Sequence, residues 1–192
     1  MKTFKTISIA LISLSLLALQ GCVTMTGEAD PENTTYISEQ QVSPDHKLYK
    51  GVKVGEVEGF AGTSVFPIMG KVSPNLNNDT ARESIERTLA SADLLASSNA
   101  SYVLDAIMID DGAIGAFGME TVWSGTERDI KIQYVLHEIN NRLKLYDEVI
   151  TSHGEASCSD KCFGLYLQER IAAERSYLIN MKNMLNALIA IK

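Results

Sequence analysis

Two runs of alternating apolar and polar residues constrain this chain more than any other feature of its sequence. The first run covers residues 129–136, and its apolar members are Ile130, Ile132, Tyr134 and Leu136. The second covers residues 142–156, and the apolar members on one face are Leu143, Leu145 and Val149. A period of two is typical of a strand with one buried face. Because Asn140 and Asn141 between the runs tolerate the backbone of a tight turn, the pattern predicts a β-hairpin.

Shorter β-rich runs predict the other strands. Residues 51–58 place Val52 and Val54 on one face, and residues 101–110 form an evenly apolar run. A further strand over residues 63–72 contains Pro67, which confines it to an edge or a bend, because proline cannot donate to a central ladder.

Helical patterns follow the first strands and end the chain. Thr80 with Glu83 three residues later matches a capping box, and helical spacing continues to about Ser97. Residues 161–190 predict a long C-terminal helix. The apolar stripe of this helix consists of Leu167, Ile171, Leu178, Met181, Leu185 and Leu188. The polar residues off the stripe are Gln168, Glu169, Arg175 and Lys182.

The order of the elements, β(β)-α-β-β-β-α, predicts the α+β fold class. We expect an antiparallel sheet of about four strands with the helices packed on one face, because each apolar face must be buried against another element. The expected domain covers residues 51–192 and is the only one.

The chain begins with a basic and then apolar segment. Lys2 and Lys5 precede an apolar run from Ile7 to Leu19, which is shorter than the ~20 residues that cross a bilayer. These parts predict a cleaved secretory signal peptide over residues 1–21. A short membrane anchor or a buried helix is the alternative.

The residues Leu19-Gln20-Gly21-Cys22 resemble the lipobox of bacterial lipoproteins, although Gln20 replaces the usual small residue. The resemblance implies cleavage before Cys22, diacylglycerol on its thiol and a fatty acyl group such as palmitate on the new amine. Several acyl chains make such attachment effectively permanent. Val23 and Thr24 follow in place of Asp, and by resemblance to the enterobacterial sorting pattern this implies the periplasmic face of the outer membrane.

Residues 23–50 are polar, with scattered apolar residues and no period. After the lipidated Cys22 they predict a flexible tether that stretches to about 90 Å. The alternative is an irregular segment packed on the domain through Tyr36, Ile37 and Tyr49.

The chain is acidic. Its net charge is −7, and removal of residues 1–21, which carry two lysines and no acid, makes it −9. A negative chain repels nucleic acid and anionic headgroups, so we expect neither as a partner. Contact with the membrane is then expected through the lipid on Cys22.

From about residue 50 to residue 190 the sequence resembles a group of small Gram-negative envelope lipoproteins. The resemblance rests on the motif A-x-Y-x-L-x-A at residues 100–106 and the motif Y-x-L at residues 134–136. The layout is similar to that of accessory lipoproteins of lipopolysaccharide assembly and lipid transport. The resemblance implies the fold and the envelope location. The lipobox, the tether and the lack of a catalytic set predict a non-enzymatic accessory component of envelope assembly or transport, which docks a partner through an open sheet face or an edge strand. A carrier of a lipid or another apolar ligand is the alternative.

Few residues suggest chemistry. Cys158 and Cys162 in an exported chain predict a disulfide, with free thiols and a metal or redox site as alternatives; the spacing fits neither a redox C-x-x-C motif nor a four-ligand zinc set. The histidines His46, His137 and His153 stand beside no recognisable nucleophile motif. We therefore expect no catalytic residue, metal or cofactor, although a cleft that gathers His153 with acidic residues would favour an enzyme.

The glycine-rich connection at residues 112–118 carries Ile114 and Phe117. A phosphate loop needs a helix N-terminus after its glycines, whereas a strand is predicted here. Exposed apolar side chains often contact a partner or a membrane, so Ile114 and Phe117 are the predicted partner contacts.

Overall fold

The computed structural model describes residues 28–66, 71–112, 125–160 and 165–191. Its elements are α2 (Pro31–Thr34), β1 (Val52–Glu58), β2 (Ser64–Phe66), β3 (Lys71–Ser73), α3 (Asn78–Ser91), β4 (Tyr102–Asp110), β5 (Thr126–Glu138), β6 (Lys144–Ala156) and α4 (Leu165–Ile189). The α+β class is confirmed. The hairpin, now β5 and β6, and the long C-terminal helix are confirmed as well.

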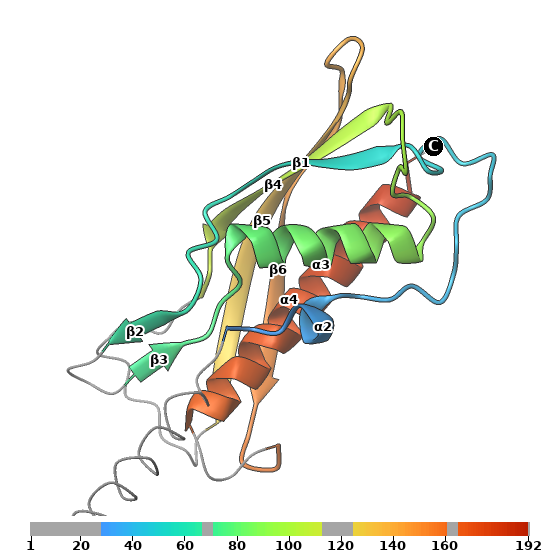
Figure 1. Cartoon of the computed structure of the whole chain (residues 1–192). Coiled ribbons are helices and arrows are strands. Elements are labelled where there is room, and N and C mark those ends of the chain that lie inside the picture. The colour runs from blue at the N-terminus through green and yellow to red at the C-terminus, as the bar shows by residue number, and fades with distance from the viewer. Residues whose placement is uncertain (1–27, 67–70, 113–124, 161–164, 192) are drawn as a thin grey trace, which may run out of the picture.

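The main sheet has the strand order β1-β4-β5-β6 (Figure 1). β4, β5 and β6 pair antiparallel, as predicted. β1 pairs parallel with β4, so the expectation of a fully antiparallel sheet is wrong for this pair. Parallel neighbours need a long crossover, and here the connection contains α3 and the small separate sheet of β2 and β3.

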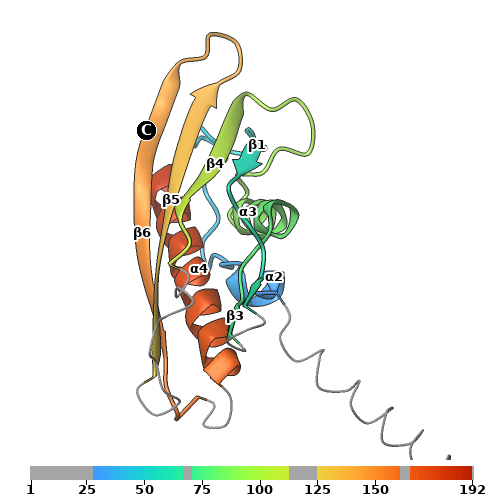
Figure 2. The ribbon, with the colours of Figure 1, turned by 90° about the vertical axis from the view of Figure 1, so that its left-hand side faces the viewer.

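Both long helices lie on the same side of the main sheet (Figure 2). α4 packs on β5 and β6, and α3 packs on β1. The core is filled by side chains that are 0% exposed, among them Leu89, Leu104, Ile132, Tyr134 and Leu185. Across the described residues, no helix or loop covers the opposite side of the sheet (Figure 2).

The buried side of β6 differs from the prediction. Tyr146 lies opposite Leu136 and Ile150 opposite Ile132, so the even-numbered residues of β6 face the helices. Val149 lies on the other side and is 50% exposed. Leu143, in the turn before β6, is also exposed, whereas Leu145 is partly buried. Both sides of this strand carry apolar residues, so alternation predicted the strand but not its buried side.

Helix α3 is shorter than predicted. Asn77 is the N-cap, and its side chain accepts from the backbone N–H of Thr80 at 2.9 Å. Thr80 is the third helical residue of this capping box, not its cap. The helix ends at Ser91 instead of about Ser97. Asp93 adopts a φ of 59°, and a residue in this left-handed region ends a helix.

Helix α4 buries Met181, Leu185 and Leu188 of the predicted stripe. Gln168 and Glu169, predicted to lie off it, are also buried, which corrects the prediction for the first turns. None of the helices that the structure describes is long and apolar enough to cross a membrane.

At its centre α4 approaches β6 closely. A Cβ atom on Gly154 would collide with the backbone of Ala172 and Ser176. The hydroxyls of Ser152 and Ser176 lie 3.1 Å apart in the same buried contact. Long apolar side chains have no room here, and this is why the apolar stripe of the helix does not continue through it.

Residues 28–50 pack against the domain, so the predicted tether is wrong from Glu28 onward. Ala29, Thr34 and Leu48 are 1%, 0% and 0% exposed. Hydrogen bonds, rather than a regular series of apolar side chains, hold this segment against α3. The Tyr36 N–H, for example, donates to Thr88 Oγ1 at 3.2 Å. The sequence lacked a signal for this because polar side chains supply much of the contact.

The alternative of a packed segment is therefore the correct one. Tyr36 and Tyr49 pack against the core as that alternative expected, whereas Ile37 is exposed.

The close approach of α4 to β6 makes a prediction for Gly154. Gly154→Ala should lower the free energy of unfolding by about 1–3 kcal/mol, because the added methyl group overpacks a rigid backbone contact. Gly51→Ala is the matched control: its Cβ would lie 3.4 Å from the Tyr102 ring, so it should be neutral or stabilising by up to about 1 kcal/mol. Urea denaturation measures both variants. Equal stability of the two variants would contradict the close packing.

Candidate functional site

The uncovered side of the sheet is the most accessible feature that the described residues build. We call it the outer face. It is formed by Val103, Asp105 and Ile107 of β4, by the odd-numbered residues of β5 from Glu127 to His137, and by Asp147, Val149, Thr151, His153 and Glu155 of β6. Period-two alternation positions all of them, because the residues between them point into the core.

The centre of the outer face carries three apolar side chains, Ile107, Val135 and Val149, among polar ones. Ile107 lies opposite Gln133, and Gln133 lies opposite Val149 on the next strand. Val135 lies beside them on β5, half-buried like Ile107. Gln133 separates Ile107 from Val149, and Val135 lies between Asp105 and Asp147, so apolar and polar side chains alternate across this part of the face.

The charges around this centre are mostly paired. The Lys144 ammonium lies 2.6 Å from the Asp147 carboxylate, and Gln133 donates to the same carboxylate at 2.7 Å. The contact with Lys144, followed by that with Gln133, holds the pKa of Asp147 below its ordinary value. His137 lies 3.5 Å from Asp105.

One end of the outer face is strongly acidic. Glu127 lies opposite Glu155, and Asp129 lies opposite His153. His153 Nδ1 donates to Asp129 Oδ1 at 2.8 Å. This hydrogen bond raises the pKa of His153, and the charges of Asp129, Glu127 and Glu155 raise it further.

The free edge of β6 is closed by side chains of α4. Asn180 Nδ2 donates to the Ile150 carbonyl at 2.9 Å, and Ser176 Oγ donates to the Ser152 carbonyl at 3.0 Å. Arg175 Nη1 donates to the Glu155 carbonyl at 2.7 Å. An edge strand whose carbonyls are occupied is a poor template for another strand.

The edge of β1 is closed in the same way. Arg82 donates to the carbonyls of Val54 and Gly55 at 3.3 and 2.8 Å. Val52 exchanges backbone hydrogen bonds with Leu94 and Ala96, at 3.0 and 2.8 Å. Of the two docking modes predicted from the sequence, strand addition is therefore blocked along these stretches, and the outer face stays open.

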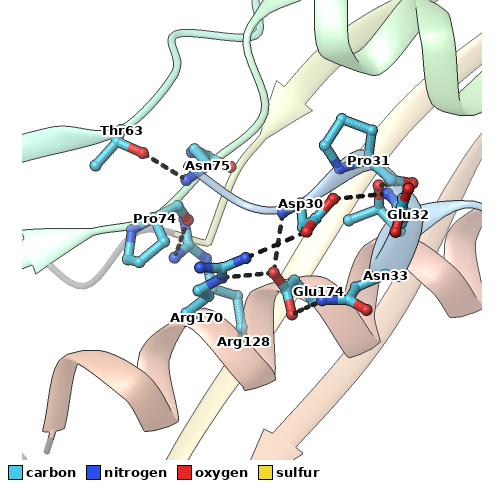
Figure 3. Close-up of polar contacts among 11 residues, drawn as sticks. Asp30, Pro31, Glu32, Asn33, Thr63, Pro74, Asn75, Arg128, Arg170 and Glu174 are labelled. Atoms are coloured by element: carbon cyan, nitrogen blue, oxygen red, sulfur yellow. Dashed lines mark hydrogen bonds and ion pairs between the residues drawn. The ribbon is translucent and has the colours of Figure 1, made fainter. Parts of the chain in front are cut away.

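The N-terminal segment is clamped to α4 (Figure 3). Glu174, 8% exposed, accepts from the Asp30 N–H at 2.9 Å and from Asn33 Nδ2 at 3.0 Å. Arg170 Nε donates to the same carboxylate at 2.7 Å, and its guanidinium lies 3.7 Å from the Asp30 carboxylate. Asp30 also caps α2 through the Glu32 N–H. This cluster joins residues far apart in sequence and fixes the path of the chain at its start.

The clamp shortens the distance between the body and any lipid on Cys22. The Ala29 N–H donates to the Asn75 carbonyl, and the Glu28 carboxylate accepts from Asn77. Between Cys22 and Glu28, six residues of fully extended chain span no more than about 20 Å. A long tether would have spanned several times this distance.

A buried arginine ties the loops at the same end of the sheet to β5. Arg128, 2% exposed, donates to the carbonyls of Asp111 and Pro74 at 2.8 and 3.0 Å. Burial lowers the pKa of its guanidinium. Sequence reasoning missed this residue because it precedes the alternating run of residues 129–136, although its even number continues the inward-facing set.

The sequence-predicted site residues lie in different places. Cys22, Ile114, Phe117 and Cys162 are outside the described residues. Cys158, at the turn after β6, is disulfide-bonded, and its pairing with Cys162 stays a prediction.

The histidines do not form a base–nucleophile pair among the described residues. His46 Nε2 contacts the Ile189 carbonyl at 3.0 Å. His153 Nδ1 is bonded to Asp129, not to the serine or cysteine that nucleophilic catalysis requires. His153 and Glu155 do line an open groove of about 480 Å³ with Arg175, Leu178 and Ile179.

No protein-family model matches the sequence, and no curated protein sequence matches it either. Several solved structures are similar in fold. A Xanthomonas campestris protein of the family model DUF330 is 13% identical, with a TM-score of 0.51, over 81% of this chain and 93% of that one. At this identity the likeness shows a shared fold and nothing more.

Two further structures match with TM-scores below 0.5. A predicted lipoprotein of Caulobacter crescentus CB15 has a TM-score of 0.48 and 13% identity, over 75% of this chain and 92% of that one. A dodecamer of PelC from Paraburkholderia phytofirmans has a TM-score of 0.44 and 18% identity, over 76% of this chain and 92% of that one.

The clamp predicts the effect of Glu174→Ala. Without this buried carboxylate, the hydrogen-bond donors of Asp30, Asn33 and Arg170 lose their acceptor. The free energy of unfolding should therefore fall by about 1–3 kcal/mol. Hydrogen exchange at the Asp30 amide should accelerate at least tenfold. Glu83→Ala, which removes an exposed pair with Arg87, should cost no more than about 0.5 kcal/mol. Unchanged exchange at Asp30 in Glu174→Ala would contradict the clamp.

Proposed function

We propose that this chain is a membrane-anchored, non-enzymatic accessory protein of the cell envelope that docks another envelope protein on its outer face. One observation carries the proposal: side chains of the helices occupy carbonyls along parts of both sheet edges, while the outer face, with Ile107, Val135 and Val149 among polar residues, is left uncovered. Closed edges direct a partner to the face, where side-chain contacts rather than strand pairing give recognition.

The anchor in this proposal is a lipid on Cys22, at the periplasmic face of the outer membrane. This part of the proposal is based on the lipobox-like residues before Cys22. The clamp at Glu174 supports it with a mechanical consequence, because a body held within about 20 Å of its lipid meets partners at the membrane surface. A flexible tether would instead let the body search a large volume.

The composition of the outer face fits a protein partner. Ile107, Val135 and Val149 supply apolar contacts near the centre, and the amide of Gln133 and the carboxylates of Asp105 and Asp147 lie between them. Protein interfaces likewise combine apolar contacts with polar ones.

A carrier of an apolar ligand is the weaker proposal. Such a carrier needs an enclosed apolar cavity. The space between the sheet and the helices is filled by side chains such as Leu104, Tyr134 and Tyr177, each 0% exposed. The groove beside His153 is open to solvent.

In-cell photo-crosslinking tests the docking proposal. Photo-reactive residues at Val135 and Val149 should capture one protein reproducibly, whereas the same group at Asn183, exposed on α4, should not. Cys22→Ser should abolish the capture, because the body is then no longer held at the membrane.

Other outcomes would overturn the proposal in distinct ways. Lipid adducts without protein at Val135 and Val149 would support the carrier. Equal capture at Asn183 would show that the outer face has no special role. Capture unaffected by Cys22→Ser would preserve the docking face and reject the anchor.

A further inference from the structure

We propose that the acidic end of the outer face is a divalent-cation site in which Glu127, His153 and Glu155 bind a metal ion of the Zn²⁺ class. The inference does not depend on the docking proposal. It rests on the placement of the donors and on the charges that surround them.

The strand register brings the donors together. Glu127 lies directly opposite Glu155, and His153 lies two residues before Glu155 on the same side of β6. One ligand atom from each residue lies within 4.8 Å of the other two. In a tetrahedral site, Zn–N and Zn–O bonds of about 2.0–2.2 Å place two donors about 3.4 Å apart. Rotation of these exposed side chains by up to about 1.4 Å at their ligand atoms would complete the site.

A neighbouring carboxylate orients the imidazole. Asp129 Oδ1 holds His153 Nδ1 at 2.8 Å; this contact places a proton on Nδ1, so a metal ion would bind at Nε2 in place of the second proton. Histidines that bind metals usually donate their other ring nitrogen to a carboxylate or a carbonyl in this way. Asp129 is therefore a positioning residue of the site and not one of its ligands.

The charge pattern is an independent reason to expect a cation. Like charges directly opposite on neighbouring strands destabilise a sheet, and Glu127 opposite Glu155 is such a pair. Among the described residues, neither carboxylate forms an ion pair with a lysine or an arginine.

Four aspartates on β4, β5 and β6 have basic partners, whereas Glu138 and Glu148 are bonded to Asn141 and Tyr146. The pairs are Asp110 with Lys131, Asp147 with Lys144, Asp105 with His137 and Asp129 with His153. A hydrogen bond with Asp160 raises the pKa of Arg175, and the charge of Glu155 raises it further, so the Glu155 carboxylate has a cation nearby. A bound divalent ion would offset the remaining repulsion between Glu127 and Glu155.

The donor set selects the class of metal. An imidazole with two carboxylates suits Zn²⁺ and related transition metals, whereas Ca²⁺ and Mg²⁺ prefer sites made of oxygen alone. Three protein ligands leave a fourth position for water or for a group on another molecule.

Titration calorimetry with ZnCl₂ on the purified full chain, freed of metal with a chelator, tests the proposal. The wild type should bind Zn²⁺ at 1:1 stoichiometry and more tightly than Ca²⁺. His153→Gln and the double variant Glu127→Gln/Glu155→Gln should bind it at least tenfold more weakly. His137→Gln is the matched control, because His137 also lies on the outer face beside a carboxylate, and it should bind like the wild type.

Equal Zn²⁺ affinity of the wild type and His153→Gln would overturn the proposal, as would no binding by the wild type at millimolar Zn²⁺. Thermal unfolding supplies a second readout. In chelator, Glu127→Gln should be at least as stable as the wild type, since it removes a like charge. Zn²⁺ should raise the midpoint temperature of unfolding of the wild type but not that of Glu127→Gln. A rise of the same size in both proteins would contradict the proposed site.

Discussion

The backbone of α4 lies against β6 at Gly154, and the positions of the other surfaces follow from this contact. At this distance the short side chains of Ser176 and Asn180 reach the carbonyls of β6 and close its edge. Glu174, on the same turns of α4, holds the N-terminal segment through Asp30 and Asn33. One helix therefore both blocks strand addition and fixes where the chain enters the body.

These two consequences define how the molecule can act. The helices and the N-terminal segment occupy one side of the sheet, and the outer face remains on the other (Figure 2). With parts of both edges occupied, the proposed partner would meet a face on which Ile107, Val135 and Val149 alternate with polar side chains. The clamp keeps that face at a short, limited distance from Cys22. The proposed anchor and the proposed docking face are thus far apart in the sequence, and α4 contacts the elements that carry both.

Much of the fold could be predicted, because in its regular strands and helices the buried residues recur with the period of the secondary structure. Ile130, Ile132, Tyr134 and Leu136 are buried on one side of β5, as their alternation predicted. The prediction failed on β6, because Ser152 and Gly154 face the core where small residues are needed, while Val149 faces outward. It failed for residues 28–50 as well, since hydrogen bonds to buried side chains such as Glu174 leave no apolar pattern.

The candidate site was even less visible in the sequence. Glu127 and His153 are far apart along the chain, and only the register of the hairpin makes them neighbours. An exposed histidine in a strand carries no sign of the carboxylates on the next strand. The predicted contacts Ile114 and Phe117 remain predictions.

The central claim is that a partner covers the outer face in the native envelope. The most direct measurement is the alkylation rate of Val149→Cys in native envelope fragments and in purified protein, with Asn183→Cys as the reference. The account predicts that the rate at position 149 falls at least tenfold in the envelope while the rate at position 183 stays the same. Equal rates at position 149 in the two preparations would contradict it.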